Sequence, residues 1–583
     1  MFAKQAHSAG AKALLLSGTF LSLLHAQSGQ AEKAVPVFKD GEAQVVDRFA
    51  DPDYWIRHDL WVETEFDSDG DGRLDRVHVS VTRPRQTETE GLKLPVVYVT
   101  SPYFAGVVKD APTYLWSPRQ ELGEEPPKRK KTAKVKRKGE RPIISKRHTK
   151  VWVPRGYVVV HSSSPGTGLS QGCVTIGGQN EALAPKAVVQ WLTGKAKGFT
   201  RPMKGEEVKA YWSTGKVGMT GTSFNGTLPL AAATTGVDGL EAIIPIAPNT
   251  SYYHYYRSNG LVRHPYGYIG EDIDCLYDLV HSGNMDRPAR RKYCDCHVRD
   301  ELMLEEFDRK NGDYNDFWAG RDYLNQLGKM KAALLMAHAF NDWNVQPEHS
   351  VRIYQACKEK GLPVQSYFHQ GGHGGEPPLK QMNRWFTRYL HGVTNDVEND
   401  PKAWIVREGD KRDEPTPYYD YPNPAAKPVT FFPSPGAPEK GTLATTKPAK
   451  PGKESLVDNF SFDGTSLAKA EWTKHRLIYT GPTLKQALHL SGTASLKIRL
   501  ASSKPAANLS VWLVSLPWND GKKAVITDNI ITRGWADPQN HQSIRKGEPL
   551  VPGKFYDLEF DLQPDDQLIA KGQQIGLMIG LFM

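Results

Sequence analysis

A single serine stands in a glycine-rich turn between a short apolar stretch and a helical stretch. Residues 216–226 read Lys-Val-Gly-Met-Thr-Gly-Thr-Ser-Phe-Asn-Gly, with Ser223 between small residues. Glycines beside a sharp strand-to-helix turn let the backbone adopt a strained angle without side-chain clashes. Such a turn raises the hydroxyl above the sheet edge and points the next backbone N–H, that of Phe224, toward a developing oxyanion. The pattern indicates a nucleophilic serine, although a plain Gly/Ser turn has the same composition.

Two partners for this serine follow downstream, each after an apolar run typical of a buried strand. Asp342 follows the first run, and His373 lies among glycines after the second. An imidazole can accept the serine proton, and a carboxylate fixes the imidazole tautomer and stabilises the imidazolium. The order serine, aspartate, histidine is that of α/β-hydrolases. We therefore predict a triad of Ser223, Asp342 and His373, with His369 as the competing base, although each residue alone is also typical of a turn or loop.

Several further blocks carry a resemblance to a known family. The chain resembles the Xaa-Pro dipeptidyl-peptidases, serine peptidases of a group that also holds the cocaine esterase-like and α-amino-acid ester hydrolases. The resemblance extends from about Arg48 to the C-terminus, and block 252–262 favours the peptidase over its esterase cousins. Phe224 stands where this group usually has tyrosine, which is immaterial if only its backbone N–H acts. The blocks are 166–168, 186–192, 221–227, 236–244, 252–262, 270–274, 341–345 and the His373 loop.

The resemblance also implies roles for residues around the triad. The Tyr103 hydroxyl would be the second oxyanion donor beside the backbone N–H of Phe224. An apolar slot lined by flat rings suits proline, whose ring offers no donor. A carboxylate, Glu271 or less strongly Asp272, would bind the free ammonium of the substrate by charge-assisted hydrogen bonds. Tyr103 could instead be a packed loop aromatic, and the two acids could mark a helix start. The slot residues are Phe104, Tyr252, Tyr255 and Val345.

The implied activity is that of a serine exopeptidase. It would release Xaa-Pro dipeptides from free N-termini of proline-containing peptides through an acyl-enzyme, with no cofactor and no metal. One alternative within the same fold is an esterase or acylase acting on α-amino-acid esters or amides. Another, of a different class, is an inactive carbohydrate- or cell-wall-binding protein. Hydrolysis of Xaa-Pro anilides against simple esters separates the first two, and reaction of Ser223 with a fluorophosphonate argues against the third.

The 583 residues are too many for one core, and the composition is that of an ordinary globular protein, with 39% hydrophobic and 24% charged residues. We expect an α/β fold, an α/β-hydrolase core with a helical cap insertion, and a C-terminal antiparallel β-sandwich that is jelly-roll-like. The last apolar segment ends the chain about a strand earlier than in relatives, so the sandwich closes differently or is truncated. The expected parts are 45–248 and 332–396 for the core, 249–331 for the cap and 401–583 for the sandwich.

The elements that must position the triad can be predicted from short apolar runs and from helical spacing. Core strands are expected at 76–81, 95–100, 157–161, 217–219, 242–246, 332–337 and 364–368, helices at 186–192 and 379–390, and sandwich strands at 494–501, 509–516, 555–562 and 575–583.

The N-terminus has the layout of a secretory signal peptide over 1–26. Lys4 and Lys12 precede the apolar stretch 13–24, and the small residue Ala26 closes it. The expected protein is secreted or periplasmic with no transmembrane segment in the mature chain, and the alternative is an uncleaved amphipathic tail.

The net charge of +9 comes from one segment. Between Lys128 and His148 there are eleven Lys or Arg residues and one acid, so the rest of the chain is near neutral. We interpret the stretch 126–148 as a solvated surface loop and expect no nucleic acid partner. The oligomeric state is left open.

Two further residue patterns bear on metals and disulfides. The five cysteines leave at least one thiol unpaired, their spacing does not indicate zinc, and their pairing stays open. The segment Asp67 to Asp75 fits positions one, three, five, six and nine of a calcium loop, but His78 stands where the bidentate glutamate belongs. An Asp/Gly-rich hairpin turn explains this segment as well.

Overall fold

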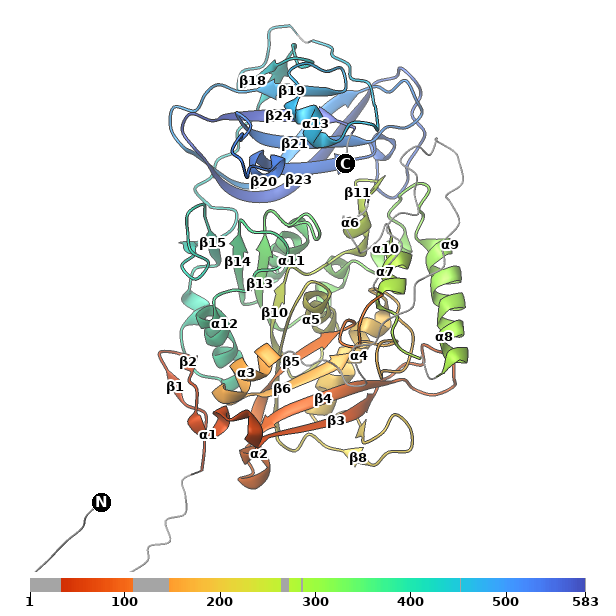
Figure 1. The fold of residues 1–583 in the computed structure, drawn as a ribbon, viewed down its shortest axis with the longest axis vertical. Helices are drawn as coiled ribbons and strands as arrows, with labels where there is room; N and C mark the ends of the chain where they lie inside the picture. The colour runs from red at the N-terminus through yellow and green to blue at the C-terminus, as the bar shows by residue number, and fades with distance from the viewer. Residues whose placement is uncertain (1–32, 109–145, 264–271, 285–286, 451, 582–583) are drawn as a thin grey trace, which may run out of the picture.

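The computed structural model describes residues 33–108, 146–263, 272–284, 287–450 and 452–581. A large mixed sheet with helices on both faces forms one end of the molecule. A β-sandwich is stacked on it along the long axis, drawn in blue in Figure 1. The signal-peptide prediction for 1–26 and most of the predicted basic loop, up to residue 145, lie outside the described residues. Lys146–Trp152 forms helix α3, so the last three residues of that predicted loop begin a helix.

The large sheet has twelve strands, and its central strands run parallel. Because both faces are covered, the central strands are buried almost throughout, and all eight residues of β5 are buried. In sheet order the strands are β16 Thr416–Tyr418, β15 Ala403–Val406, β14 Val364–His369, β13 Ala333–Ala339, β10 Leu240–Ile246, β9 Ser213–Thr222, β5 Leu94–Ser101, β6 Val158–Ser163, β4 Arg76–Pro84, β3 Trp55–Glu63, β7 Gly198–Phe199 and β8 Glu207–Val208.

Helices cover the two faces through two separate apolar clusters. Successive strand residues point to opposite faces, so Val96 and Tyr98 enter one cluster and Val97 the other. The first face packs against α4 Gln179–Leu192, α5 Phe224–Thr234 and α11 Glu348–Glu359, and the second against α3 and α12 Leu379–Phe386.

The insertion between β10 and β13 is mainly helical in its described residues and supplies most of a third apolar cluster, including Tyr253, Leu276 and Trp318. A disulfide between Cys173 and Cys294 fastens this insertion to the loop after β6, which answers the pairing question that the sequence left open. Cys275, Cys296 and Cys357 form no disulfide. The elements of the insertion include α6 Tyr252–Tyr256, β11 Arg257–Ser258, β12 Leu261–Val262, α7 Ile273–Val280, α8 Pro288–Cys294, a π-helical segment Asp295–Met303, α9 Leu304–Glu306, α10 Asp316–Ala319 and a 3-10 stretch Tyr323–Lys329.

The C-terminal part is a sandwich of two sheets around one apolar cluster that includes Val511, Phe560 and Ile579. Its strands pair antiparallel, except that β18 and β19 run parallel over two residue pairs. The antiparallel sandwich expected from the period-two pattern is therefore confirmed. The sheets are β17 Phe432–Ser434, β18 Gly441–Ala444, β19 Arg476–Thr480, β24 Gln574–Gly580, β21 Leu509–Leu516 and β22 Ile530–Ala536, opposed by β20 Leu488–Leu500 and β23 Tyr556–Ile569.

Two features of the chain differ from the sequence prediction. The boundary placed at residue 401 is too early, because β15 pairs parallel with β14 and β16 pairs with β15, so both belong to the large sheet. The rise of proline and lysine after residue 401 concealed these two short strands. Strand β3 was not predicted, because its polar and charged residues interrupt the apolar pattern and lie toward one edge of the sheet.

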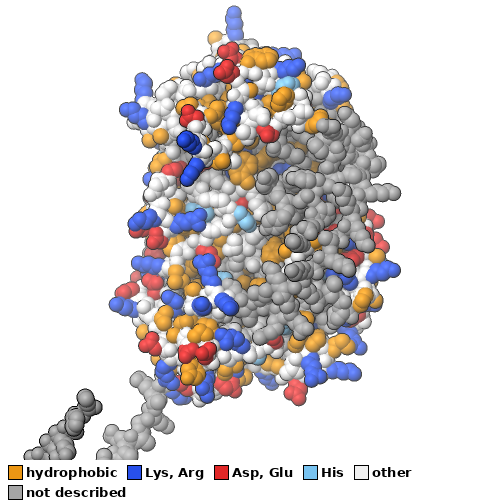
Figure 2. All heavy atoms as spheres, in the orientation of Figure 1, with side chains coloured by type: hydrophobic (Ala, Val, Ile, Leu, Met, Phe, Trp, Pro, Cys, Tyr) orange, Lys and Arg blue, Asp and Glu red, His pale blue; other side chains and the backbone are white. Residues whose placement is uncertain are grey.

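Membrane-spanning helices and surface charge can both be assessed for the described part of the chain. None of its helices combines the length and the apolar character needed to cross a bilayer. On the face drawn in Figure 2, the Lys and Arg side chains are interspersed with Asp and Glu.

Candidate active site

Ser223 occupies the turn between β9 and α5 in a conformation that non-glycine residues rarely adopt. Its φ is 65° and its ψ is −129°. Backbone strain of this kind costs about 1–3 kcal/mol and persists only where the surroundings enforce it. Here the Ser223 N–H donates to the Ile246 carbonyl at 2.9 Å, and the Ser223 carbonyl accepts from the N–H of Gly226 at 2.8 Å. The sharp turn expected from the sequence is therefore present.

Gly221 and Gly226 are needed at this turn because backbone atoms crowd both positions. A Cβ on Gly221 would lie 2.4 Å from the Asn225 carbonyl oxygen. One on Gly226 would lie 2.7 Å from the Ile246 carbonyl oxygen and 2.8 Å from that of Gly221. Neither contact can be relieved by turning a side chain, so only glycine fits the two positions without moving the elbow.

Asp342 follows β13, two strands away from β9, and is completely buried. Its Oδ2 accepts a hydrogen bond from Nδ1 of His373 at 2.7 Å. Its Oδ1 accepts from the backbone N–H groups of Asn344 and Val345 at 2.9 and 3.0 Å. Burial opposes ionisation of Asp342, but hydrogen bonds from His338 and His373 outweigh it and hold its pKa well below the usual range. The carboxylate is thus ionised and oriented.

His373 lies in the glycine-rich loop after β14, and 28% of its side chain is exposed. The competing base His369 is buried and occupied within that loop. Its Nδ1 accepts from the Gly371 N–H at 3.0 Å, so Nε2 carries the proton and donates to the Gly374 carbonyl at 2.9 Å. Burial lowers the pKa of His369 to about 4. The structure brings Asp342 together with His373, whereas both ring nitrogens of His369 form hydrogen bonds with the backbone of the glycine-rich loop.

The His373 loop also passes beside the elbow. A Cβ on Gly374 would lie 3.7 Å from Cγ2 of Thr222, the residue before Ser223. Within the described residues, the Ser223 hydroxyl makes no hydrogen bond. Serine–histidine bonds of hydrolases are often long without substrate and tighten when it binds.

The two residues proposed to supply the oxyanion donors, Tyr103 and Phe224, are neighbours because β5 and β9 are adjacent in the sheet. Tyr103 follows β5, and its N–H donates to the Ser101 Oγ at 3.0 Å. Its ring meets the Phe224 ring edge to face, with centroids 6.0 Å apart. The Tyr103 side chain therefore lies beside Phe224, the first residue of α5.

The predicted slot residues separate into two places. Tyr252, Tyr255 and Val345 are buried in one apolar cluster with Phe224, and Tyr103 packs at its margin. The Tyr255 hydroxyl donates to Oδ1 of Asn344 at 2.7 Å, which links the insertion to the Asp342 loop.

Phe104 lies outside this cluster. Its ring packs edge to face on His161, with centroids 5.6 Å apart.

The two candidate ammonium ligands also differ. Glu271 lies outside the described residues. Asp272 is buried, caps α7, and pairs with Arg257 at 3.0 Å and with Arg309 at 3.3 Å. These two guanidinium groups already balance its charge within the insertion.

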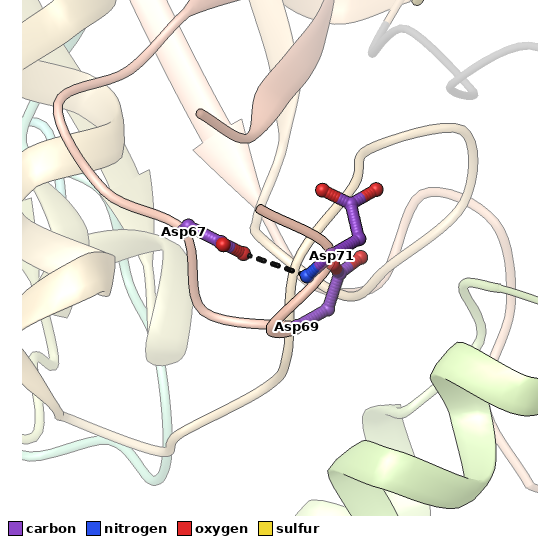
Figure 3. Close-up of side chains that lie close together, drawn as sticks. All are labelled: Asp67, Asp69 and Asp71. Carbon is purple, nitrogen blue, oxygen red and sulfur yellow. Dashed lines mark hydrogen bonds between the residues drawn. The ribbon is translucent and has the colours of Figure 1, made fainter. Parts of the chain in front are cut away.

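Figure 3 shows the acidic loop that also fits a calcium pattern. Oxygens of Asp67, Asp69 and Asp71 lie within 4.8 Å of one another. Arg287 pairs with Asp69 at 3.1 Å and with Asp71 at 3.3 Å. Asp67 accepts from the N–H groups of Asp71 and Gly72, at 3.2 and 2.8 Å, as in an Asp/Gly turn. A cation at this loop would compete with Arg287 for two of the three carboxylates, and calcium binding stays an alternative to the Asp/Gly turn.

One polar residue at the site was missed in the sequence. His338 lies on β13, and its Nε2 is 2.9 Å from the Val345 carbonyl oxygen and 3.3 Å from Oδ2 of Asp342. It lies four residues before Asp342, a spacing that could have suggested the contact. The apolar run around it instead marked it as part of a strand.

Comparisons with known proteins agree with this geometry. Residues 69–375 match the model of the X-Pro dipeptidyl-peptidase S15 family, and residues 395–580 match that of the X-Pro dipeptidyl-peptidase C-terminal non-catalytic domain. A putative Xaa-Pro dipeptidyl-peptidase of Rhodopirellula baltica is 66% identical, with 97% of this chain and 90% of the relative covered. One of Bacillus anthracis is 39% identical, with 90% and 83% covered.

Solved structures show the same fold at low identity. An α-amino acid ester hydrolase superposes with a TM-score of 0.64 at 15% identity, covering 93% of this chain and 92% of that one. A CocE/NonD family hydrolase from Staphylococcus aureus gives 0.59 at 15% identity, covering 90% and 88%. The fold class is thus that of the α/β-hydrolases, and the chain belongs to the S15 family of X-Pro dipeptidyl-peptidases.

Proposed function

We propose that this protein is a serine exopeptidase that releases Xaa-Pro dipeptides from the free N-termini of peptides. The single observation that carries the chemistry is the 2.7 Å hydrogen bond between His373 and the buried Asp342. Both residues follow the carboxyl ends of central strands, as does the strained Ser223. The relatives named Xaa-Pro dipeptidyl-peptidases support the substrate class.

In the proposed reaction, Nε2 of His373 takes the Ser223 proton as Oγ attacks the carbonyl carbon of the substrate's proline residue. Asp342 holds Nδ1 protonated and stabilises the imidazolium. The backbone N–H of Phe224 and the Tyr103 hydroxyl donate to the oxyanion. His373 then protonates the leaving amine, and the same groups activate water to hydrolyse the acyl-enzyme. No step requires a cofactor.

Substrate selection would come from the insertion between β10 and β13 together with the loop that carries Asp342. Tyr252, Tyr255 and Val345 supply the rings and branched side chain that a proline ring can pack against. Glu271 remains the proposed ligand of the substrate ammonium, and Phe104 a further slot residue by resemblance. Asp272 is the weaker choice, because Arg257 and Arg309 already engage it.

A panel of chromogenic substrates tests the proposal on the wild-type protein. Ala-Pro p-nitroanilide should be hydrolysed efficiently, whereas its N-acetylated form should react poorly because the ammonium is lost. Simple esters and amino-acid esters should be much poorer substrates by kcat/KM. Faster hydrolysis of the esters than of the free Ala-Pro anilide would instead favour the esterase or acylase alternative.

We further propose that the protein is exported after cleavage of residues 1–26. The Cys173–Cys294 disulfide supports this location, because stable disulfides belong to oxidising compartments. N-terminal sequencing of the protein from fractionated cells should find a mature start near residue 27, and an intact Met1 in the cytoplasmic fraction would contradict it.

We also propose that 45–248 and 332–396, extended through β16, fold together as the core, that 249–331 forms the cap, and that the residues after β16, through 583, form the sandwich. Apart from cuts in the predicted basic loop 126–148, limited proteolysis should cut first between β16 and β17.

A further inference from the structure

A buried arginine of the sandwich reaches the loop that carries Asp342. Arg533 lies on β22, 1% exposed. Its Nη1 donates to the Phe340 carbonyl at 3.2 Å, and its Nη2 donates to the Asp342 carbonyl and, at 2.7 Å, to Oε1 of Gln346. All three acceptors belong to residues 340–346, the segment after β13. The guanidinium therefore spans this loop from end to end.

Aromatic packing holds the guanidinium against the same loop. Its carbon lies 4.2 Å from the centre of the Trp343 ring. Trp343 in turn meets Trp535, also on β22, edge to face at 6.4 Å. A planar guanidinium can stack on a ring and donate several bonds in its plane at once, which a lysine ammonium cannot do.

The sandwich also touches the loop that carries His373. The Gln370 amide donates to the Asp566 carbonyl on β23. The Glu348 N–H at the start of α11 donates to Oε1 of Gln563 at 3.2 Å, also on β23. Figure 1 shows the sandwich stacked over this end of the core, beside α11 and α6. Strand β22 thus contacts the loop that carries Asp342, and strand β23 contacts the loop that carries His373.

The orientation of the Asp342 carboxylate depends on the shape of its loop. Its Oδ1 is held by the N–H groups of Asn344 and Val345, within the segment that Arg533 spans. If the segment shifts, these donors shift with it, and Oδ2 moves relative to Nδ1 of His373. A displacement of about 1 Å in catalytic geometry can cost about 100-fold in rate.

We propose that Arg533 is a positioning residue of the peptidase reaction, supplied by the sandwich, that fixes the Asp342 loop so that the carboxylate meets His373. The proposal rests on the role proposed for Asp342. It makes the C-terminal sandwich part of the catalytic apparatus without contact to substrate.

The test compares Arg533→Ala with a matched control, Arg476→Ala. Arg476 is also buried in the sandwich and donates to carbonyls, but its acceptors are Ala437, Pro438, Leu467 and Ala470, all within the sandwich. Both variants should lower Tm. Arg533→Ala should also lower kcat about 100-fold on Ala-Pro p-nitroanilide with KM within about twofold, while folded Arg476→Ala keeps its kcat.

Two further measurements separate positioning from folding. Methylguanidinium at millimolar concentration should restore part of the kcat of Arg533→Ala and leave Arg476→Ala unchanged. Arg533→Lys keeps the positive charge but replaces the guanidinium with a single ammonium group. This variant should fold and have an intermediate kcat. Full kcat in folded Arg533→Ala, or failure of Arg533→Lys to fold, would overturn the proposal. Asp342→Asn belongs in the series, because its kcat should fall about 10⁴-fold. If it does not, the triad itself is wrong, a result distinct from failure of the Arg533 proposal.

Discussion

Substitution of Gly226 by alanine sets two physical effects of opposite sign against each other. Alanine in place of glycine within a helix stabilises by about 0.5–1 kcal/mol when its methyl group has room. At Gly226 the methyl would lie 2.7 Å from the Ile246 carbonyl oxygen, 2.8 Å from that of Gly221 and 3.1 Å from the Ile246 N. Overpacking of this kind typically costs about 1–3 kcal/mol. Because all three atoms belong to the backbone, we expect the clash to win.

The expected result is a loss of stability of about 1–2 kcal/mol together with a lower kcat, since relief of the clash requires the elbow to move. Chemical denaturation measures the first and the Ala-Pro p-nitroanilide assay the second. Gly328→Ala is the matched control, because Gly328 lies in a 3-10 stretch and a Cβ there meets no atom within 4 Å. If Gly226→Ala were as stable and as active as wild type, the account of the elbow would be wrong.

Three other expectations follow from the structure. Tyr103→Phe should lower kcat by about 100- to 1,000-fold, equivalent to about 3 kcal/mol, with little change in KM; an unchanged kcat would remove Tyr103 from the oxyanion site. Cys294→Ser should lower the unfolding free energy by up to about 5 kcal/mol, because the disulfide closes a loop with a sequence separation of 121, whereas Cys296→Ser at a free thiol should change it little in the same denaturation experiment. Burial raises the pKa of Asp75 to about 7, from about 4 in an unfolded chain, so its contribution to stability is present below pH 4 and lost as pH rises to about 7. The unfolding free energy of Asp75→Asn should therefore fall less than that of wild type over this range, and parallel curves would contradict the assignment.

The parts of this fold that the sequence predicts well are those encoded locally. Each expected core strand has a counterpart in the sheet, because a strand buried on both faces is a continuous apolar run. The turn at Ser223 could be recognised because the glycines that it requires, Gly221 and Gly226, lie within a few residues of the serine. The family blocks then supplied Tyr103, which no local pattern identifies.

The parts that could not be predicted depend on contacts between distant segments. Five cysteines allow several pairings, and only the fold brings Cys173 and Cys294 together. Phe104 follows directly after Tyr103, yet its ring packs on His161 and not with the rings of the insertion. Arg533 lies 191 residues from Asp342, and nothing around it in sequence marks it as a partner of that loop.

Reaction of the protein with a fluorophosphonate, combined with the Ser223→Ala variant, tests the central claim most directly. Mass spectrometry of labelled wild type should place one adduct on Ser223, with complete loss of Ala-Pro p-nitroanilide hydrolysis. Ser223→Ala should be folded, unlabelled and lower in kcat by at least about 10⁴-fold. An adduct on another residue, or a variant that keeps its peptidase activity, would contradict the assignment of Ser223 as the nucleophile.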